Sequence, residues 1–358
     1  MRKMRISKIP AILICLAAFF GMEAALAQGL FLAAPRASQY ASVTQRIGLT
    51  DITINYHRPG VKGREVWGTL VPYNEVWRAG ANENTTISFT HDVAVNGKKL
   101  PAGTYGLHMI PGEGDWTVIF SKNHTSWGSF FYDEAEDAAR VTVTPVKTSE
   151  NRDWLEYRFE DLTKNSAVVQ LCWEKLMIPF KIEVDVNAIA LQSIRNELRG
   201  LDAFAWQPWM EAANYCLQNN TNLDQGIEWI DHSIGMNQNV NNMGVKAQLL
   251  SKKGDAAGAE KTMAEALAFA KQTGRENDLN TVGYMYLQSN RVKEATEVFK
   301  LNVKKYPGSW NVYDSLGEAQ AQAGDKKSAI ANYQTALSKA PDNQKGRIEG
   351  ILKELRKN

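Results

Sequence analysis

The segment 282–307 reads VGYMYLQSNRVKEATEVFKLNVKKYP, and 34 residues later the segment 316–341 reads LGEAQAQAGDKKSAIANYQTALSKAP. Similar residue types stand at matching places: Val282-Gly283, Tyr286, Ala295, Phe299 and Pro307 in the first segment, and Leu316-Gly317, Gln320, Ala329, Tyr333 and Pro341 in the second. A repeat of this length holds two helices, with small residues where the helices cross and an aromatic ring between them. The C-terminal half is therefore predicted to be a stack of helix pairs.

Two further copies precede this pair. Ala247, Gly254, Ala259, Met263 and Ala266 fit a copy displaced by 36 residues, and Trp209 to Ile234 fit a weaker one. The pattern resembles tetratricopeptide repeats over about 206–343, with 344–358 as a capping helix and 186–205 as a linker helix.

The resemblance implies a solenoid with a concave groove that engages a protein or peptide. The groove positions are Asn277, Asn280, Tyr284, Gln288, Asn311, Asp314 and Glu318. The basic clamp with which some such repeats hold a terminal carboxylate is missing. An alternative is that these side chains form solvated helix faces that serve only solubility.

Residues 38–185 follow a different pattern, with short runs of period two separated by Gly, Pro, Asn and Asp. In the run Asp51–His57, for example, Ile52, Ile54 and Tyr56 share one face. About nine such runs, among them 167–174 and 178–185 as separate strands, with no helix-length segment between most of them, predict an antiparallel β-sandwich. The fold class is therefore a β-sandwich followed by an α-helical solenoid.

One connection within this region is unusually long, since residues 57–86 join two predicted strands. Its candidate binding residues are His57, Arg58, Lys62, Arg64, Trp77, Arg78, Asn82 and Glu83. Guanidinium groups suit carboxylate or phosphate, and aromatic rings suit sugar faces, so a glycan or anionic ligand is one interpretation. The other is a self-packed loop in which Arg58 and Arg64 pair with Glu65, Glu75 or Glu83 and the rings form a small core.

Motifs in and beyond this loop resemble a secreted bacterial family, domain of unknown function 2911. They are Arg58–Arg64, Leu70–Tyr73, Val76–Glu83, Thr85-Thr86, Lys99–Tyr105 and Trp116–Phe120. The resemblance covers about 38–185 and implies export and a β-sandwich, without an assigned activity. His57 departs from the small polar residue expected at its position.

The N-terminus has the layout of a cleaved signal peptide. Residues 1–27 hold a basic start, an apolar run from Ala11 to Phe20 and the small-residue end Ala25-Leu26-Ala27. The apolar run is short for a membrane span, so a retained anchor is the lesser alternative. We therefore expect an exported protein, periplasmic or extracellular and not membrane-embedded after cleavage, with a linker at 28–37.

The charge balance argues against a nucleic-acid partner. The formal charge of +2 comes from the first 27 residues, which hold four basic residues and one acidic residue. Residues 28–185 hold 16 basic against 19 acidic residues, and residues 186–358 hold 21 against 19. Neither part has the basic excess that phosphate backbones require. Cys172 and Cys216, which lie in different predicted domains, are expected to be separate buried thiols rather than a disulfide.

Motifs for metal ligands, phosphate loops and nucleophile elbows are absent from the sequence, so no catalytic residue, metal or cofactor is predicted. The expected function is non-catalytic binding. One alternative is a secreted hydrolase with Glu83 or His57 as general base and Arg58 or Arg78 stabilising an oxyanion. Another is a purely structural envelope protein.

Overall fold

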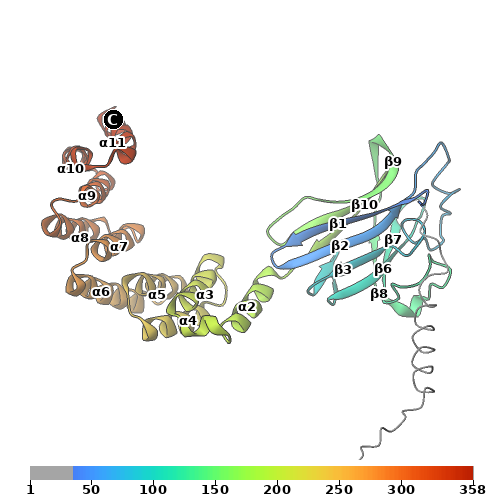
Figure 1. The fold of residues 1–358 in the computed structure, drawn as a ribbon, viewed down its shortest axis with the longest axis horizontal. Helices are drawn as coiled ribbons and strands as arrows, with labels where there is room; N and C mark the ends of the chain where they lie inside the picture. The colour runs from blue at the N-terminus through green and yellow to red at the C-terminus, as the bar shows by residue number, and fades with distance from the viewer. Residues whose placement is uncertain (1–34, 358) are drawn as a thin grey trace, which may run out of the picture. The chain divides into compact units, whose positions relative to one another are not determined.

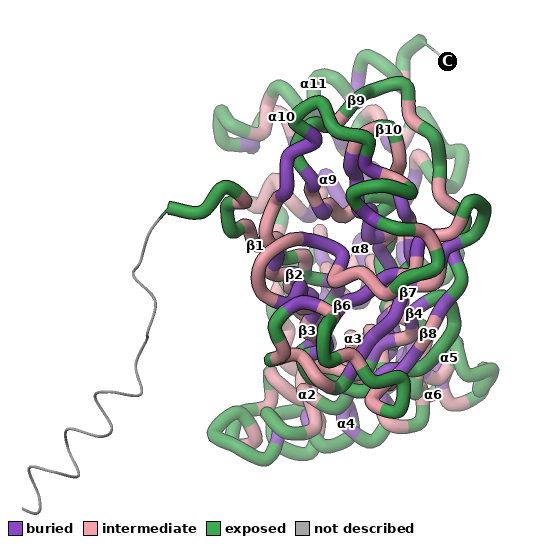
Figure 2. Tube along the Cα trace, turned by 90° about the vertical axis from the view of Figure 1, so that its right-hand side faces the viewer, coloured by how far each residue is buried: buried purple, intermediate pink, exposed green. Residues whose placement is uncertain are grey.

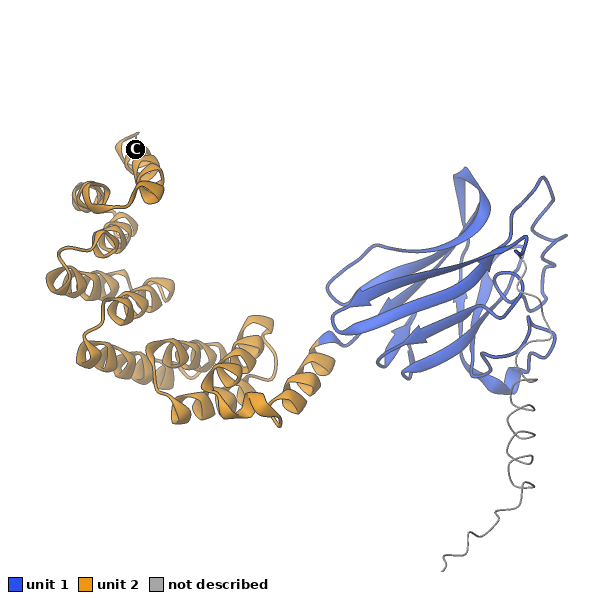
Figure 3. Ribbon diagram, in the orientation of Figure 1, with its two compact units in different colours: residues 1–186 blue, residues 187–358 orange. Residues whose placement is uncertain are grey.

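The computed structural model describes residues 35–357, and the chain divides into two compact units, residues 1–186 and 187–358 (Figure 3). The predicted signal peptide, residues 1–27, lies outside the described residues, as do residues 28–34 of the predicted linker. Among the described residues, no helix combines the length and apolar character needed to cross a bilayer.

The first unit is built from ten strands among its described residues (Figure 1). They are β1 (Gln39–Ile47), β2 (Thr50–Arg58), β3 (Thr86–Phe89), β4 (Val93–Val95), β5 (Lys98–Leu100), β6 (Gly103–Ile110), β7 (Trp116–Ser121), β8 (Asp137–Val143), β9 (Val146–Glu160) and β10 (Ser166–Glu183). A 3-10 turn, η1 (Glu134–Glu136), lies between β7 and β8.

These strands form two antiparallel sheets. The six-stranded sheet has the order β1-β2-β3-β6-β7-β8, and the four-stranded sheet has the order β5-β4-β10-β9. Aromatic pairs join the two sheets: Tyr56 of β2 meets Tyr157 of β9 at 4.8 Å between ring centroids, and Phe120 of β7 meets Phe180 of β10 at 5.9 Å. The predicted antiparallel sandwich is confirmed.

The strand sequences explain which faces are buried. In β2 burial alternates, with Ile52, Ile54 and Tyr56 buried, as the period-two pattern predicts. Both β6 and β7 are largely buried, and Figure 2 colours β7 mostly purple. The segments 167–174 and 178–185, expected as two strands, belong to the single strand β10, because bulges around Glu174 absorb the break in the apolar pattern.

The second unit contains ten α-helices among its described residues. They are α2 (Val186–Glu197), α3 (Trp206–Asn219), α4 (Leu223–Met236), α5 (Val240–Lys253), α6 (Ala256–Thr273), α7 (Glu276–Gln288), α8 (Val292–Lys305), α9 (Trp310–Gln322), α10 (Lys326–Lys339) and α11 (Asp342–Lys357); a 3-10 turn, η2 (Leu201–Phe204), follows α2. Helices α3 to α10 pair in order, α3 with α4 and so on, which confirms the predicted repeats.

Close contacts between small residues and rings hold each pair together. A Cβ atom built on Gly283 of α7 would lie 2.3 Å from the ring of Phe299 in α8, and one on Gly317 of α9 would lie 3.0 Å from Tyr333 in α10. The helices of a pair can approach this closely only because a side chain is missing at the crossing. Helix α11 covers the last pair, and its Ile348 and Leu352 pack in the cluster that contains Tyr333.

Substitution of Gly283 by alanine is expected to destabilise the helical unit by about 1–3 kcal/mol, because the added methyl group overpacks a ring that is fully buried. In the matched control Gly350→Ala, on α11, the added Cβ meets open space, so alanine stabilises by at most about 1 kcal/mol through helix propensity. Urea unfolding followed by far-ultraviolet circular dichroism measures both. Equal stability of the two variants would contradict the packing account.

Candidate functional site

The long connection between β2 and β3 is fastened to the sandwich at several points. Trp77 exchanges two backbone hydrogen bonds with Met109 of β6, each 2.8 Å long. Near its start, Val61 N–H donates to the carbonyl of Asp153 in β9 at 2.7 Å. The connection is therefore an ordered part of the unit, in keeping with the self-packed interpretation.

Four tryptophan rings form a core beneath it. Trp67 lies 4.9 Å from Trp116 and 5.5 Å from Trp173, measured between ring centroids, and Trp77 stacks on Trp173 at 5.9 Å. Trp116 and Trp173 are each 1% exposed. This geometry favours a packing role for Trp77 over ligand contact.

The basic residues at the start of the connection are held by the protein itself. Arg58 donates to the carbonyl of Leu155 at 2.8 Å and lies 3.6 Å from the carboxylate of Glu156. Arg64 donates to the carbonyls of Gly60 and Val61. The Lys62 ammonium lies 5.8 Å from the centre of the Trp154 ring. The expected pairing of Arg58 and Arg64 with Glu65, Glu75 or Glu83 is thus wrong, because Arg58 binds a carbonyl and Glu156, and Arg64 binds two carbonyls.

His57 and Glu83 form a second group. His57 Nε2 lies 3.3 Å from Glu83 Oε2, an electrostatic contact without hydrogen-bond alignment, and Arg36 pairs with the other carboxylate oxygen. Burial lowers the pKa of His57, and Arg36 adds to this while Glu83 opposes it. For Glu83, burial raises the pKa, but Arg36, His57 and a backbone hydrogen bond together hold it below its usual value. Asn82 donates to the carbonyl of Ser38 at 3.1 Å.

Arg78 belongs to neither group. It has no hydrogen bond or ion pair with any described residue, and its Nε is buried without a partner. Its electrostatic neighbour is His108 of β6, whose Nδ1 shares a 2.9 Å hydrogen bond with the hydroxyl of Ser129. Sequence reasoning missed His108 and Ser129, since three separate segments meet here and no spacing links them.

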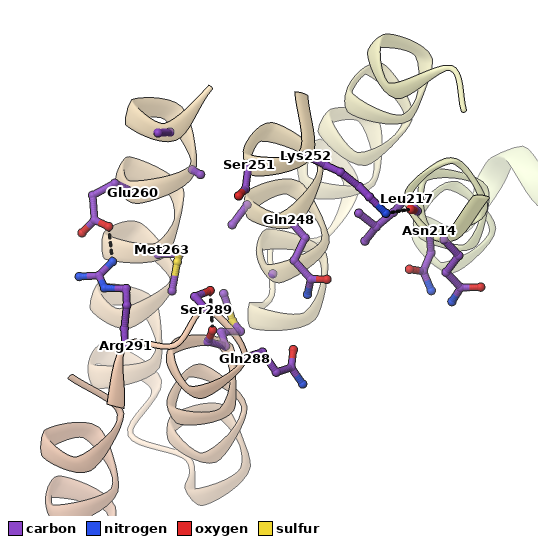
Figure 4. Close-up of a pocket in the computed structure, with 16 residues that line it drawn as sticks. Asn214, Leu217, Gln248, Ser251, Lys252, Glu260, Met263, Gln288, Ser289 and Arg291 are labelled. Carbon is purple, nitrogen blue, oxygen red and sulfur yellow. Dashed lines mark hydrogen bonds and ion pairs between the residues drawn. The ribbon is translucent and has the colours of Figure 1, made fainter. Parts of the chain in front are cut away.

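In the helical unit, a groove of about 690 Å³ lies among α3, α5, α6 and α7 (Figure 4). Its polar lining includes Asn214, Gln218, Gln248, Ser251, Lys252, Glu260, Gln288, Ser289 and Arg291. The charged members are engaged: Lys252 donates to the carbonyl of Leu217 at 3.0 Å, and Arg291 pairs with Glu260. The side-chain amides of Asn214, Gln248 and Gln288 make no hydrogen bond with any described residue, which leaves them open to a ligand.

The predicted groove residues are distributed unevenly. Gln288 lines this groove, whereas Asn277 lines a separate hollow of about 490 Å³ with Arg275 and Tyr306. Asn280 carries a buried Oδ1 without a partner, and Asn311 is half-exposed. The structure therefore does not bring all seven residues into one hollow.

Three of the predicted groove residues make contacts of their own. Tyr284 donates to Glu318 at 2.7 Å, and its pKa rises to about 12 through burial, with Glu318 adding to the effect. Asp314 accepts a hydrogen bond from Arg347 at 2.9 Å. Burial raises the pKa of Asp314 despite this bond.

Asn214 and Gln248 were missed as groove residues, although the sequence holds a signal for them. Asn214, Gln248, Tyr284 and Glu318 follow one another at spacings of 34, 36 and 34 residues, so the four occupy one repeat position. Carrying the groove positions back through the weaker copies would have found both residues.

Comparisons with known proteins agree with this division of the chain. Residues 38–182 match the model of a family described as Protein of unknown function (DUF2911). The match confirms the predicted resemblance, which the motifs placed at about 38–185. No curated protein sequence matches the chain.

Solved structures similar to the helical part are repeat proteins. MamA protein is 16% identical with a TM-score of 0.31, and the match covers 44% of this chain and 84% of that chain. YrrB, described as a TPR protein with an unusual peptide-binding site, is 16% identical with a TM-score of 0.31, over 46% of this chain and 84% of that chain. A tetratricopeptide repeat protein from Parabacteroides merdae is 16% identical with a TM-score of 0.33, over 47% of this chain and 64% of that chain. At these TM-scores the likeness carries no argument, and the assignment of the helix pairs depends on the period and contacts of this chain.

Replacing Trp77 by alanine should lower the free energy of unfolding of the β unit by about 3 kcal/mol, because it empties part of the tryptophan core. Trp127→Ala is the matched control, since that ring is 50% exposed and its loss should cost less than about 1 kcal/mol. Chemical denaturation followed by near-ultraviolet circular dichroism distinguishes the two. A Trp77→Ala variant as stable as the control would place Trp77 on a binding surface.

The β unit should become less stable as the pH is lowered, because protonation of His108 favours the unfolded state. Burial lowers the pKa of His108 from 6.5 to about 4, so the folded state favours the neutral ring. Stability from this residue is complete above the unfolded pKa and is lost at about 1.4 kcal/mol per pH unit as pH falls from 6.5 toward 4. Denaturant unfolding across this range should show a shallower slope for His108→Gln than for His124→Gln. Identical slopes would contradict the assignment.

Proposed function

We propose that this is an exported, non-catalytic binding protein whose helical repeats engage an extended segment of a partner protein or peptide. The groove of about 690 Å³ among α3, α5, α6 and α7 carries the proposal. Its volume is within the range typical of ligand sites.

The chemistry of the groove supports a peptide backbone as ligand. A side-chain amide offers both donors and an acceptor, which matches the N–H and C=O groups of an extended chain. Glu260 and Arg291 neutralise each other, and the ammonium of Lys252 is held on the carbonyl of Leu217, so the lining carries little net charge to select an ionic ligand. Neutral amides on successive repeats suit a ligand that runs along the helices.

Export is supported by the layout of residues 1–27. The two thiols are compatible with an oxidising compartment, since Cys172 and Cys216 are both buried and free. Burial raises the pKa of both thiols, to about 11 for Cys216, and a protonated thiol is a poor nucleophile for disulfide exchange. We propose a periplasmic or extracellular location.

Export predicts that cleavage after Ala27 leaves a mature protein that begins with Gln28. Intact-mass spectrometry of the protein from the envelope fraction of a bacterial host measures this terminus. A species that retains Met1 and stays with the cytosol would contradict export.

For the β unit we propose a binding role toward an anionic ligand; a glycan is the alternative that its aromatic residues suggested. The hydrolase alternative is less favoured, because His57 and Glu83 already contact each other and Arg36, while the electrostatic neighbour of Arg78 is His108. A purely structural envelope role would leave the open amides of the helical groove without a purpose.

The groove is tested with the double variant Gln248→Ala/Gln288→Ala. Both side chains are exposed, so the melting temperature should be unchanged, while binding of envelope proteins to the immobilised full-length protein should fall at least about tenfold. The matched control is Gln272→Ala/Gln334→Ala, which removes two exposed amides from α6 and α10 outside the groove. Quantitative mass spectrometry of the retained proteins should show the same set for wild type and control. An identical set for the groove variant would refute the proposal.

A further inference from the structure

Arg78 differs from every other described arginine of the β unit. Eight arginines lie between residues 35 and 186, and seven of them have a carboxylate or carbonyl partner. Arg78 has neither among the described residues, although its side chain is half-buried and its Nε is shielded from solvent. A buried cation without a counter-charge is costly, so the site favours an anion that the protein itself does not supply.

The groups around Arg78 leave that positive charge uncompensated. His108 is buried, and its lowered pKa keeps it neutral at neutral pH. The carboxylate of Asp137, which acts electrostatically on His108, accepts hydrogen bonds from Arg140 and from the hydroxyl of Tyr132. Asp137 is therefore neutralised by another arginine and does not serve as the counter-ion of Arg78.

Two glycines let polar groups of this region pack directly against the backbone. A Cβ atom on Gly128 would lie 2.5 Å from Arg78 Nη1, so any side chain there would cover the guanidinium. A Cβ atom on Gly106 would lie 2.5 Å from the carbonyl oxygen of Asn123, 2.9 Å from the amide nitrogen of Asn84 and 3.2 Å from Nε2 of His108. The Asn84 amide nitrogen donates to that carbonyl at 3.4 Å. Asn84 Oδ1 is buried without a partner. Polar groups of Asn84 and His108 thus gather over a backbone that carries no side chain.

The segment that meets Arg78 at Gly128 exposes three large aromatic rings. Trp127 is 50% exposed, Phe130 is 79% exposed and Phe131 is 74% exposed. The Phe130 ring reaches the same backbone position as the guanidinium, since both lie within 3.5 Å of a Cβ built on Gly128. Exposed apolar rings beside an unpaired cation suit a ligand with an apolar body and one anionic group.

We propose that Arg78, together with the neighbouring His108, binds the carboxylate of a small organic acid whose apolar body packs on Phe130 and Phe131. A carboxylate fits the planar guanidinium fork through two parallel hydrogen bonds. One cation beside a neutral imidazole matches a monoanion, whereas a phosphate group carries nearly two charges at neutral pH. This inference rests on the proposed binding role of the β unit and is independent of the helical groove.

The test is isothermal titration calorimetry on the mature full-length protein with phenylacetate at neutral pH. Phenylacetate should bind one to one, whereas phenylacetamide, which lacks the charge, and acetate, which lacks the ring, should each bind at least about tenfold more weakly. Arg78→Gln should weaken phenylacetate binding about ten- to a hundredfold, and Arg78→Lys by an intermediate factor, because lysine keeps the charge without the fork. Arg46→Gln is the charge-matched control, on an exposed ion pair with Asp51, and should bind as wild type does.

Two further measurements separate binding from folding. Arg78→Met should melt at the same temperature as wild type or higher, since an unpaired charge is removed; a marked drop would assign Arg78 a structural role and overturn the proposal. Phe130→Ala/Phe131→Ala changes only exposed rings and should weaken phenylacetate binding without affecting acetate.

Other outcomes would also overturn the assignment. Equal affinity for phenylacetate and phenylacetamide, or no phenylacetate binding at millimolar concentrations, would refute it. If the wild-type protein binds inorganic phosphate but not phenylacetate, and Arg78→Gln no longer binds phosphate, the site would be assigned to phosphate instead. Because the groove is tested with Gln248 and Gln288 in the other unit, failure of one proposal leaves the other standing.

Discussion

The close approach of paired helices is the constraint on which the proposed binding groove depends. Gly283 meets the ring of Phe299, and Gly317 meets the ring of Tyr333, so the same crossing is built in successive pairs. Each pair buries one apolar face against its neighbour, which leaves the same helix positions open in every repeat. Asn214, Gln248, Tyr284 and Glu318 share one such position at spacings of 34, 36 and 34 residues; the first two amides are open, whereas Tyr284 donates to Glu318. Regular packing thereby produces a regular polar surface.

Most charged side chains at the two candidate sites are held by partners among the described residues. In the helical groove Lys252, Glu260 and Arg291 are engaged, so only amides and hydroxyl groups are left for a ligand. In the β unit the arginines pair with carboxylates and carbonyls, and Arg78 is the exception among the described residues. Because residues 28–185 hold 16 basic against 19 acidic residues, the anion binding that we propose for this unit depends on this one guanidinium rather than on the net charge of the unit.

The sequence predicts helices and strands whose residue patterns are periodic. It misses contacts between residues that are far apart in the sequence and come together only in the folded chain. The 34-residue repeat predicts α7 to α10, because each helix pair packs a glycine against an aromatic ring at the same crossing. The alternation of apolar and polar residues predicts the buried face of β2. The join of two expected strands into β10 was missed because a bulge near Glu174 hides the continuity. The Arg78 site was missed in part for a different reason, since Asn84, His108 and Ser129 come from separate segments. The partners of Arg58 and Arg64 were wrong because sequence spacing cannot reveal Glu156 or nearby carbonyls.

The central claim is that the amide-lined groove of the helical unit holds a segment of another protein. The most direct measurement is photo-crosslinking in living cells, with a photoreactive amino acid in place of Gln248, followed by identification of the adduct. The account predicts a discrete adduct whose linkage maps to an extended segment of one partner, and none when the same group replaces the exposed Gln272 on α6. Equal crosslinking from both positions, or none from position 248, would contradict the claim.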